Sequence, residues 1–247
     1  MINLLRRIRK NMMTEKKSDL YLVYAIGEVV LVVLGILIAL QIDNWNENKK
    51  VKNIEQQYLL ALKDEFTFNK GELERIMNRN QLNFESAKKI LDNTGPGDPD
   101  ITDEAFGKLL INSLSTETRF DPNQGVLDEI ISSGKLGIFR NNELKFALSS
   151  WSGKLYRVRL QEQEFLSMRS RTIELVRNEA NLRKALGTVL DGMGIKKTKF
   201  DQGNLHLLNS VVFEGHMTGF ATMSLNLNNR YYPQLVEEID KILSFIE

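Results

Sequence analysis

Residues 21–42 read YLVYAIGEVVLVVLGILIALQI, an almost purely apolar run with one acidic residue. At about 1.5 Å per residue, a helix of this length spans roughly 33 Å, enough to cross a bilayer core of about 30 Å. A cleaved signal peptide has a shorter apolar region, about 7 to 15 residues, followed by small residues at the cleavage site. The run ends in ALQID without such a pattern. We therefore expect an uncleaved signal anchor that crosses a membrane once.

The charges on either side of this run predict its orientation. Before it, six basic residues stand against two acidic ones: Arg6, Arg7, Arg9, Lys10, Lys16 and Lys17 against Glu15 and Asp19. After it, three lysines at positions 49, 50 and 52 are partly balanced by nearby acids. Because basic flanks stay in the cytoplasm, we expect a basic cytoplasmic head over 1–20, a transmembrane helix over 21–42 and an extracytoplasmic helical domain over 43–247.

Aromatic and basic residues at the ends of the run indicate contacts with lipid headgroups. Tyr21 and Tyr24 lie at one end and Trp45 at the other, as in the aromatic belts of membrane proteins. The head adds arginines that suit an anionic leaflet. The expected membrane-interface anchors are Arg6, Arg7, Arg9, Tyr21, Tyr24 and Trp45. The lipid bilayer is therefore the first expected partner.

Glu28 is the one charged residue inside the run. An acid at mid-membrane costs about 2.5 to 3.5 kcal/mol on insertion scales, so it normally faces protein or water. At 100° per residue, five positions fall on one side of the helix: Ala25, Glu28, Val32, Gly35 and Ala39. We expect this side, the association face, to meet a second copy of the helix or another membrane protein. The alternative, an ion or proton path through Glu28, is less favoured because a single acid makes a poor pore lining.

The apolar run and the residues that follow it resemble a known family signature. Residues 24–47, YAIGEVVLVVLGILIALQIDNWNE, resemble the signature of an uncharacterised family, a domain-of-unknown-function family of small single-pass membrane proteins common in the Bacteroidota. A stretch such as residues 133–144, SGKLGIFRNNEL, is similar to the family's helical region. The resemblance implies membrane placement and a bacterial source. Together with the charge bias around the run, it leads us to expect a bacterial inner membrane with the C-terminal domain in the periplasm. It implies no activity, cofactor or catalytic residue.

Beyond the run, residues 51–91 carry the stripe of a long amphipathic helix. Apolar residues recur there at steps of three and four: Val51, Ile54, Tyr58, Leu62, Phe66, Leu73, Met77, Phe84, Ala87 and Leu91. We expect this helix to continue the membrane helix and to end at the breakers TGPGDPD over 94–100. Asn80 lies on the stripe, where a single Asn is expected to fix the register of packing.

Cap and stop signals predict the remaining helices. Thr102 followed by two acids opens a short helix to about Leu114, and Asp121 with Pro122 opens a second that stops at Gly134. Asn141 or Asn142 caps a long helix to about Leu186.

Glu162 and Arg169 fall near the apolar seam of that long helix, seven residues apart. They could pair with each other's copies or with another helix, but we expect them at a solvated edge. The glycine-rich residues 187–204 form a connector without phosphate-loop spacing. Helical spacing resumes over 205–247, where Pro233 marks a kink or break and Gly215 with Gly219 permits close helix contact. No period-two pattern competes. The fold class is therefore all-α: one N-terminal transmembrane helix followed by a bundle of three long and two or three short helices.

The composition of the chain argues against several classes of binding and catalytic site. The net charge is +1, which argues against nucleic-acid binding, and the absence of cysteine excludes disulfides and thiolate sites. The two histidines, His206 and His216, are ten residues apart and cannot share one metal on one helix. No serine has an associated base. We expect no enzyme activity, no cofactor and no metal.

The sequence therefore predicts a membrane-anchored extracytoplasmic helical interaction or sensory module. It would work as a homo-oligomer or as an accessory subunit of an envelope complex. The alternative is an oligomeric channel or ion-coupled component that uses Glu28.

Overall fold

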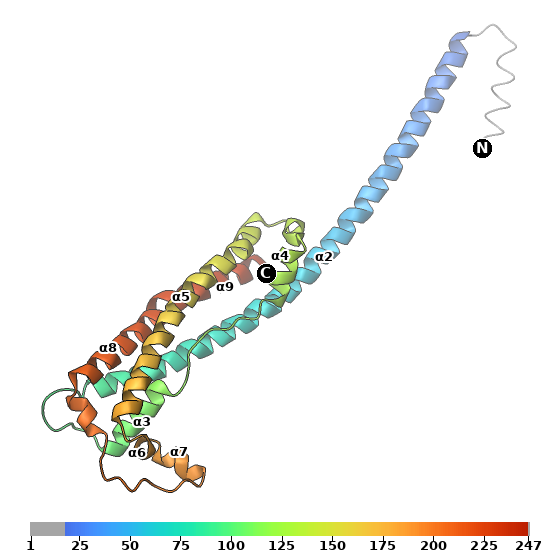
Figure 1. The fold of residues 1–247 in the computed structure, drawn as a ribbon. Coiled ribbons are helices and arrows are strands. Elements are labelled where there is room, and N and C mark those ends of the chain that lie inside the picture. Colours follow the sequence, from blue (N-terminus) through green and yellow to red (C-terminus); the bar gives the residue numbers. More distant parts are fainter. Residues whose placement is uncertain (1–17, 247) are drawn as a thin grey trace. The chain divides into compact units, whose positions relative to one another are not determined.

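The computed structural model describes residues 18–246, with side chains described for residues 22–187 and 190–246. These residues form helices joined by turns and loops, without any strand in the described part of the chain, which confirms the all-α class (Figure 1). The chain divides between Gln57 and Tyr58 into two compact units. The first unit contributes one helical segment, and the second is a helical bundle.

The longest helix, α2 (Ser18–Leu91), contains both the apolar run and the amphipathic stripe. The expected continuation of the membrane helix into residues 51–91 is thus confirmed. Within the bundle, α2 buries one side, which includes Leu62, Phe66, Leu73 and Ile90. Three- and four-residue spacing places these side chains on one side because the helix turns every 3.6 residues.

Two short helices follow, one as predicted and one with a different start. Helix α3 (Asp103–Leu114) begins where Thr102 Oγ1 accepts a hydrogen bond from the Ala105 N–H at 3.2 Å. Helix α4 (Gly125–Ser132) begins four residues later than the Asp121 start, which was wrong because the Asp121 carboxylate pairs instead with a side chain of α5. Gly134 has φ +69°, a left-handed conformation that favours glycine, and confirms the stop before the 3-10 helix η1 (Lys135–Ile138).

The second long helix, α5 (Asn142–Glu179), is capped by Asn141, whose Oδ1 accepts hydrogen bonds from two main-chain N–H groups. It ends at Glu179 rather than near Leu186. Asn181 explains the difference, because its side chain caps a separate short helix, α6 (Leu182–Ala185). The predicted connector contains one further short helix, α7 (Gly187–Gly192).

The C-terminal part comprises η2 (Leu205–Asn209), α8 (Val211–Asn226), the π-helical turn η3 (Leu227–Tyr231) and α9 (Tyr232–Ile246). In place of a break at Pro233, the α-helix changes to a π-helical turn just before this proline, which has no N–H to donate. The backbone remains helical at Leu227 and Tyr232, so α8 and α9 follow each other without a loop. The two glycines of α8 differ. A Cβ at Gly219 would lie 2.9 Å from Met168 Cε, whereas a Cβ at Gly215 would meet no atom within 4 Å. Only Gly219 therefore supports a close helix contact.

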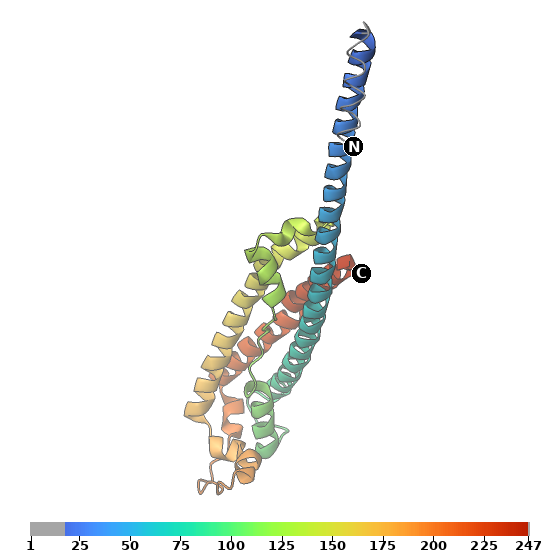
Figure 2. The same cartoon turned by 90° about the vertical axis from the view of Figure 1, so that its right-hand side faces the viewer.

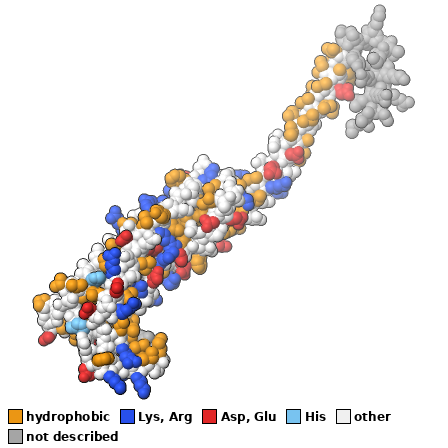
Figure 3. All heavy atoms as spheres, in the orientation of Figure 1, with side chains coloured by type: hydrophobic (Ala, Val, Ile, Leu, Met, Phe, Trp, Pro, Cys, Tyr) orange, Lys and Arg blue, Asp and Glu red, His pale blue; other side chains and the backbone are white. Residues whose placement is uncertain are grey.

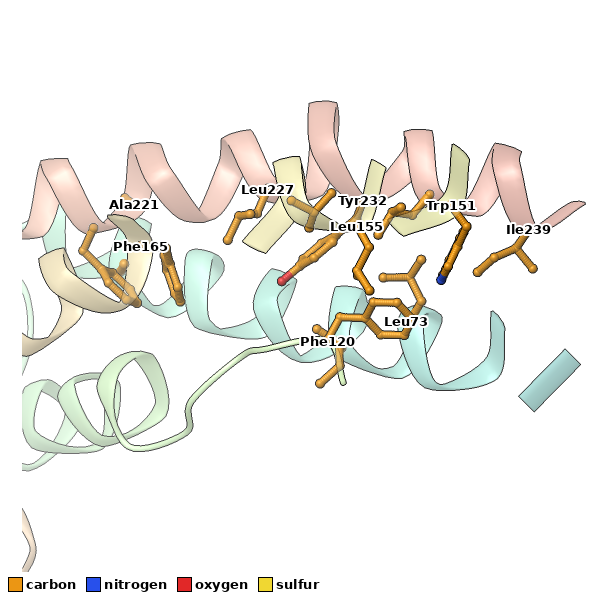
Figure 4. Packing of buried hydrophobic residues seen from close by; sticks show 14 of the residues in the cluster. Leu73, Phe120, Trp151, Leu155, Phe165, Ala221, Leu227, Tyr232 and Ile239 are labelled. Atoms are coloured by element: carbon orange, nitrogen blue, oxygen red, sulfur yellow. The ribbon is translucent and has the colours of Figure 1, made fainter. Parts of the chain in front are cut away.

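The core lies between the second half of α2, α5 and the α8–α9 pair, which run side by side in both views (Figures 1 and 2). Trp151 is fully buried, and its ring packs edge-on against Phe66 with centroids 5.2 Å apart. Phe165 and Phe220 lie 5.3 Å apart farther along (Figure 4 labels Phe165 and Trp151). The α2 stripe thus packs on the side of α5 that contains Trp151, and the three long elements share one core.

Candidate functional site

Residues 22–42 of α2 expose all of their side chains. Leu31 is 74% exposed and Val23 is 67% exposed, so no residue of the described chain covers this surface. Figure 3 shows the hydrophobic side chains following one another along this part of the helix. Among the described residues, α2 is the one helix long and apolar enough to cross a membrane. Contiguous apolar surface of this size is unfavourable in water and favourable in lipid.

The association face is continuous on this helix. Its five residues fall within a sector about 80° wide, given 3.6 residues per turn. All five are exposed, and a Cβ at Gly35 would meet no atom within 4 Å. Glu28 forms no hydrogen bond or ion pair with any described residue. The geometry leaves room for a second helix to approach here, and the identity of that helix stays a prediction.

Two of the predicted interface anchors are open to their surroundings. Tyr24 is 55% exposed and Trp45 is 64% exposed. The ammonium of Lys49 lies 5.4 Å from the Trp45 ring centroid, a cation–π contact that suits a headgroup region. Tyr21 belongs to α2, but its side chain lies outside the described side chains. The anchors Arg6, Arg7 and Arg9 lie outside the described residues.

In the bundle, two side chains of α2 hold the chain that leads into α4. Glu65 is buried, and its carboxylate accepts hydrogen bonds from the Val126 N–H at 2.8 Å and the Leu127 N–H at 3.2 Å. It thereby caps a helix that has no side-chain cap of its own. Asn69, one turn along, exchanges two hydrogen bonds of 2.7 Å with the main chain of Asn123. Burial raises the pKa of Glu65, and the two main-chain hydrogen bonds oppose that rise.

A second buried carboxylate, Glu162 of α5, joins three parts of the bundle. Its Oε1 accepts hydrogen bonds from the Phe120 N–H at 2.8 Å and the Tyr232 hydroxyl at 2.9 Å. Its Oε2 lies 3.5 Å from Arg159 Nη1, and Arg159 also bonds Asp121 at 2.6 Å. Burial raises the pKa of Glu162. Figure 4 shows Phe120 and Tyr232 reaching into the core from different segments.

The expectation of a solvated edge was therefore wrong for Glu162, which is 1% exposed. Main-chain and hydroxyl donors satisfy Oε1 of this buried carboxylate, whereas Oε2 has no hydrogen-bond partner among the described residues and faces the Arg159 guanidinium at 3.5 Å. Arg169 is half-buried, and its Nε has no hydrogen-bond partner among the described residues. Burial lowers the pKa of its guanidinium. The two side chains are not partners of each other.

Asn80 behaves as its place on the stripe predicted. It is fully buried, and its Nδ2 donates to the Ser224 carbonyl at 2.7 Å and to Asn228 Oδ1 at 2.9 Å. The Ser224 hydroxyl donates back to Asn80 Oδ1 at 2.8 Å. This reciprocal contact between α2 and α8 admits one register, because a shift would leave buried polar groups without partners.

The histidines belong to different elements. His206 lies in η2, with Nδ1 3.1 Å from the Gly203 carbonyl and Nε2 3.1 Å from the Glu179 carbonyl. His216 lies in α8 and is half-buried. Within residues 18–246, no three potential metal-ligating side chains gather into a group.

A shallow hollow between α5 and α9 carries charges of both signs. Its lining comprises Lys154, Arg157, Gln234, Glu237, Glu238 and Lys241. Glu238 is almost fully buried and pairs with Lys154. Because acids and bases alternate here, the hollow presents no uniform charge to a ligand.

Sequence reasoning missed the buried acids and amides that organise the bundle. Glu65 and Asn69 have the same 3.6-residue phase as Leu62 and Phe66, which is the signal that would have found them. Glu162 likewise lies four residues after Val158 and three before Phe165. The helical phase of these residues indicates that they are buried, whereas their polar side chains suggest a position on the surface. The structure shows that the helical phase predicted their burial correctly.

Comparison with known proteins shows the family to which the chain belongs. The chain matches a family of unknown function (DUF6090) over residues 28–181. No curated protein and no solved structure matches it. The match includes most of the apolar run, the whole of α3 and α4, and α5 to its end. Because the matched residues make up more than half of the 247, the chain belongs to this family of unknown function, DUF6090.

Proposed function

We propose that the protein is a membrane-anchored helical interaction module. Residues 22–42 span a membrane, the association face joins a second transmembrane helix, and the bundle provides a folded domain for envelope partners. The observation that supports this proposal is the contrast in exposure. The apolar run leaves every side chain uncovered, whereas the bundle encloses its own core. Such a run is stable in lipid, and such a bundle is stable in water.

The association face supports a self-associating anchor. Gly35 and Ala39 let a second backbone come close, because small residues at a helix contact reduce the distance between the axes. Close approach supplies Glu28 with a hydrogen-bond partner in place of hydrocarbon. A second copy is the most economical partner, since the same face then satisfies itself around a two-fold axis. Another membrane protein of an envelope complex is the other form of this proposal.

Co-capture of differently tagged copies from one membrane tests self-association. The chain offers a matched pair of glycines, Gly35 on the face and Gly27 about 120° away from its centre. Gly35→Leu should abolish co-capture of the second tagged copy, while Gly27→Leu should leave it unchanged. Equal loss in both variants would exclude the association face, and no co-capture of the unmodified chain would exclude self-association. Identification of proteins captured with the unmodified chain from native membranes then tests the accessory-subunit form.

The proposed orientation places the N-terminus in the cytoplasm and the bundle in the periplasm of a bacterial inner membrane. The excess of basic residues before the run supports it. A protease added outside intact spheroplasts should digest residues beyond about position 45 and spare the head. Protection of the bundle would reverse the orientation.

An oligomeric ion path is the second candidate, because Glu28 is the one carboxylic acid within residues 22–42. Protein reconstituted in vesicles would then conduct ions or protons, and Glu28→Gln would remove that flux. If Glu28 serves only as a hydrogen-bonding group, Glu28→Gln should preserve association and change no flux. Ion flux measured for the unmodified chain and for Glu28→Gln therefore distinguishes the ion path from the interaction module.

A further inference from the structure

A loop at one end of the bundle is fixed to the body at its stem. Asp103, in the first turn of α3, accepts a hydrogen bond from the Asn204 N–H and lies 3.5 Å from Lys184 Nζ. A Cβ at Gly203 would lie 2.8 Å from the Asp103 carboxylate, so a glycine is needed at this approach. One carboxylate thus holds both the chain entering the loop and the chain leaving it.

The two segments of the stem, which enter and leave the loop, are also hydrogen-bonded to each other. The Asn181 N–H donates to Asn204 Oδ1 at 2.7 Å, and Asn204 Nδ2 donates to the Asn181 carbonyl at 3.3 Å. On the body, Gly107 of α3 lies flush against the chain, where a Cβ would come within 3.0 Å of Ala185 Cα. These contacts orient the segment that the stem carries.

The tip of this loop, residues 191–200, reads DGMGIKKTKF and has an unusual surface. Phe200 is 79% exposed, Met193 is 68% exposed and Ile195 is 38% exposed. The lysines Lys196, Lys197 and Lys199 are exposed between them, and none forms a salt bridge within the described part of the chain. In Figure 3, basic and hydrophobic side chains gather at the lower end of the molecule, where Figure 1 draws α6 and α7.

The charge of this region differs from that of the chain as a whole. Within residues 182–204, five cations stand against two carboxylates, a net charge of +3: Arg183, Lys184, Lys196, Lys197 and Lys199 against Asp191 and Asp201. Two acids of α3 face this segment. Asp103 lies 3.5 Å from Lys184. The hydrogen bond from Lys108 lowers the pKa of Glu104, and the charge of Lys197 helps to lower it. The entire chain has a net charge of +1. An anionic surface would therefore attract this end of the bundle before any other feature came into contact.

We propose that the loop tip 191–200 docks on an anionic lipid bilayer surface. The three apolar side chains enter the headgroup region, and the lysines keep their ammonium groups at the phosphates while their stems lie along the apolar boundary. The distribution of residues favours lipid over a protein partner. Its apolar side chains alternate with lysines on irregular backbone, whereas a protein partner is met by a continuous apolar patch. The inference is independent of the anchor in residues 22–42.

The test uses the full chain reconstituted in neutral phosphatidylcholine vesicles. Because the chain has no cysteine, Thr198→Cys attaches an environment-sensitive fluorophore at the tip while leaving its apolar residues and lysines in place. Ser149→Cys, at an exposed position of α5, provides the matched control label. Adding phosphatidylglycerol vesicles should blue-shift the label at 198 and leave the label at 149 unchanged. Neutral vesicles should shift neither.

Two sets of variants separate charge from insertion. Replacing the three tip lysines by Gln should raise the concentration of phosphatidylglycerol vesicles needed for half of the blue shift at position 198. At low salt the increase should be roughly a hundredfold, because each lysine near an anionic surface contributes about a factor of five. Phe200→Ser should weaken the blue shift, whereas Phe146→Ser, at an equally open position of α5, should not.

Three results would overturn the proposal. The first is an absent shift at position 198, and the second is an equal shift with neutral vesicles. The third is a shift with soluble polyglutamate but none with phosphatidylglycerol, which would indicate an acidic protein as the partner instead. The basic head can hold vesicles near the chain, but it cannot move the label at 198, so the readout remains specific to the tip.

Discussion

The two halves of α2 differ in how densely apolar residues occur and in where their side chains lie. In residues 22–42 the apolar side chains surround the helix, and all are exposed. In the bundle half they form a stripe, so that Phe66 is 1% exposed while Phe68, two residues later, is 56% exposed. A helix that is apolar all round suits hydrocarbon, whereas a striped helix suits other helices on one side and water on the other. Both the density of apolar residues and their arrangement around the helix distinguish the two environments.

The acidic residues in the two parts of the chain also differ in their hydrogen-bond partners. Glu65 and Glu162 in the bundle are buried and accept hydrogen bonds from main-chain or hydroxyl donors. Glu28 in the apolar run has no such donor among the described residues. A bundle carboxylate is thus satisfied within the chain, and we expect the carboxyl of Glu28 to be satisfied from outside it.

The largest effect should come from placing a charge on the buried side of the stripe. Phe66→Asp should lower the free energy of unfolding by about 4 kcal/mol or more, because it leaves a cavity beside Trp151 and buries an unpaired carboxylate. Phe68→Asp, on the exposed side, should change it by less than about 0.5 kcal/mol. Denaturant unfolding of the full chain in detergent micelles, followed by tryptophan fluorescence, gives both values. Equal midpoints for the two variants would show that the stripe does not define the core.

A smaller effect should come from the polar contacts of the same helix. Asn69→Ala leaves the Asn123 N–H and carbonyl without their partners, and should cost about 1 to 3 kcal/mol. It should also speed amide hydrogen exchange at residues 123–127. The control is Asn78→Ala, an exposed position on α2. If the two variants were equally stable and equally protected, α2 would not hold the chain that leads into α4.

The smallest effect concerns pH. Burial raises the pKa of Glu162 above its ordinary value of 4.5, so the folded state keeps a proton that the unfolded state has already released. The corresponding stability is present below pH 4.5 and is lost as pH rises through the folded-state pKa. Glu162→Gln cannot ionise and should flatten this decline.

Unfolding of both proteins across the range from about pH 4 to 8 measures the difference. Part of the decline should persist in the variant, because burial also raises the pKa of Glu65. Asp121 acts in the opposite direction, since the hydrogen bond from Arg159 lowers its pKa and its contribution is lost on acidification. Identical pH profiles would show that folding leaves the pKa of Glu162 unchanged, and would contradict the effect of its burial.

Much of the fold was predictable because helix patterns are local. The stripe over 51–91, the caps at Thr102 and Asn141 and the stop at Gly134 each depend on residues within a few positions. The errors arose where distant residues decide. Asp121 resembles a helix start, but Arg159 of α5 pairs with it, and the helix begins at Gly125.

The candidate site was predictable only in part, for a related reason. Phase places Ala25, Glu28 and Gly35 on one side of a helix without any knowledge of tertiary structure. The stem of the docking loop depends on Asp103 meeting Asn204, residues far apart in the sequence, so residues 187–204 could be predicted only as a connector. The exposure of Phe200 likewise appears only in the folded structure.

Disulfide crosslinking in native membranes tests the central claim, a face-specific association of the apolar run, most directly. The chain contains no cysteine, so any crosslink must come from an introduced thiol. Cysteine at position 35 or 39 lies on the association face, while cysteine at position 37 lies about 160° from its centre. The account predicts efficient crosslinking at 35 and 39 and none at 37. Equal crosslinking at all three positions, or none at any of them, would contradict it.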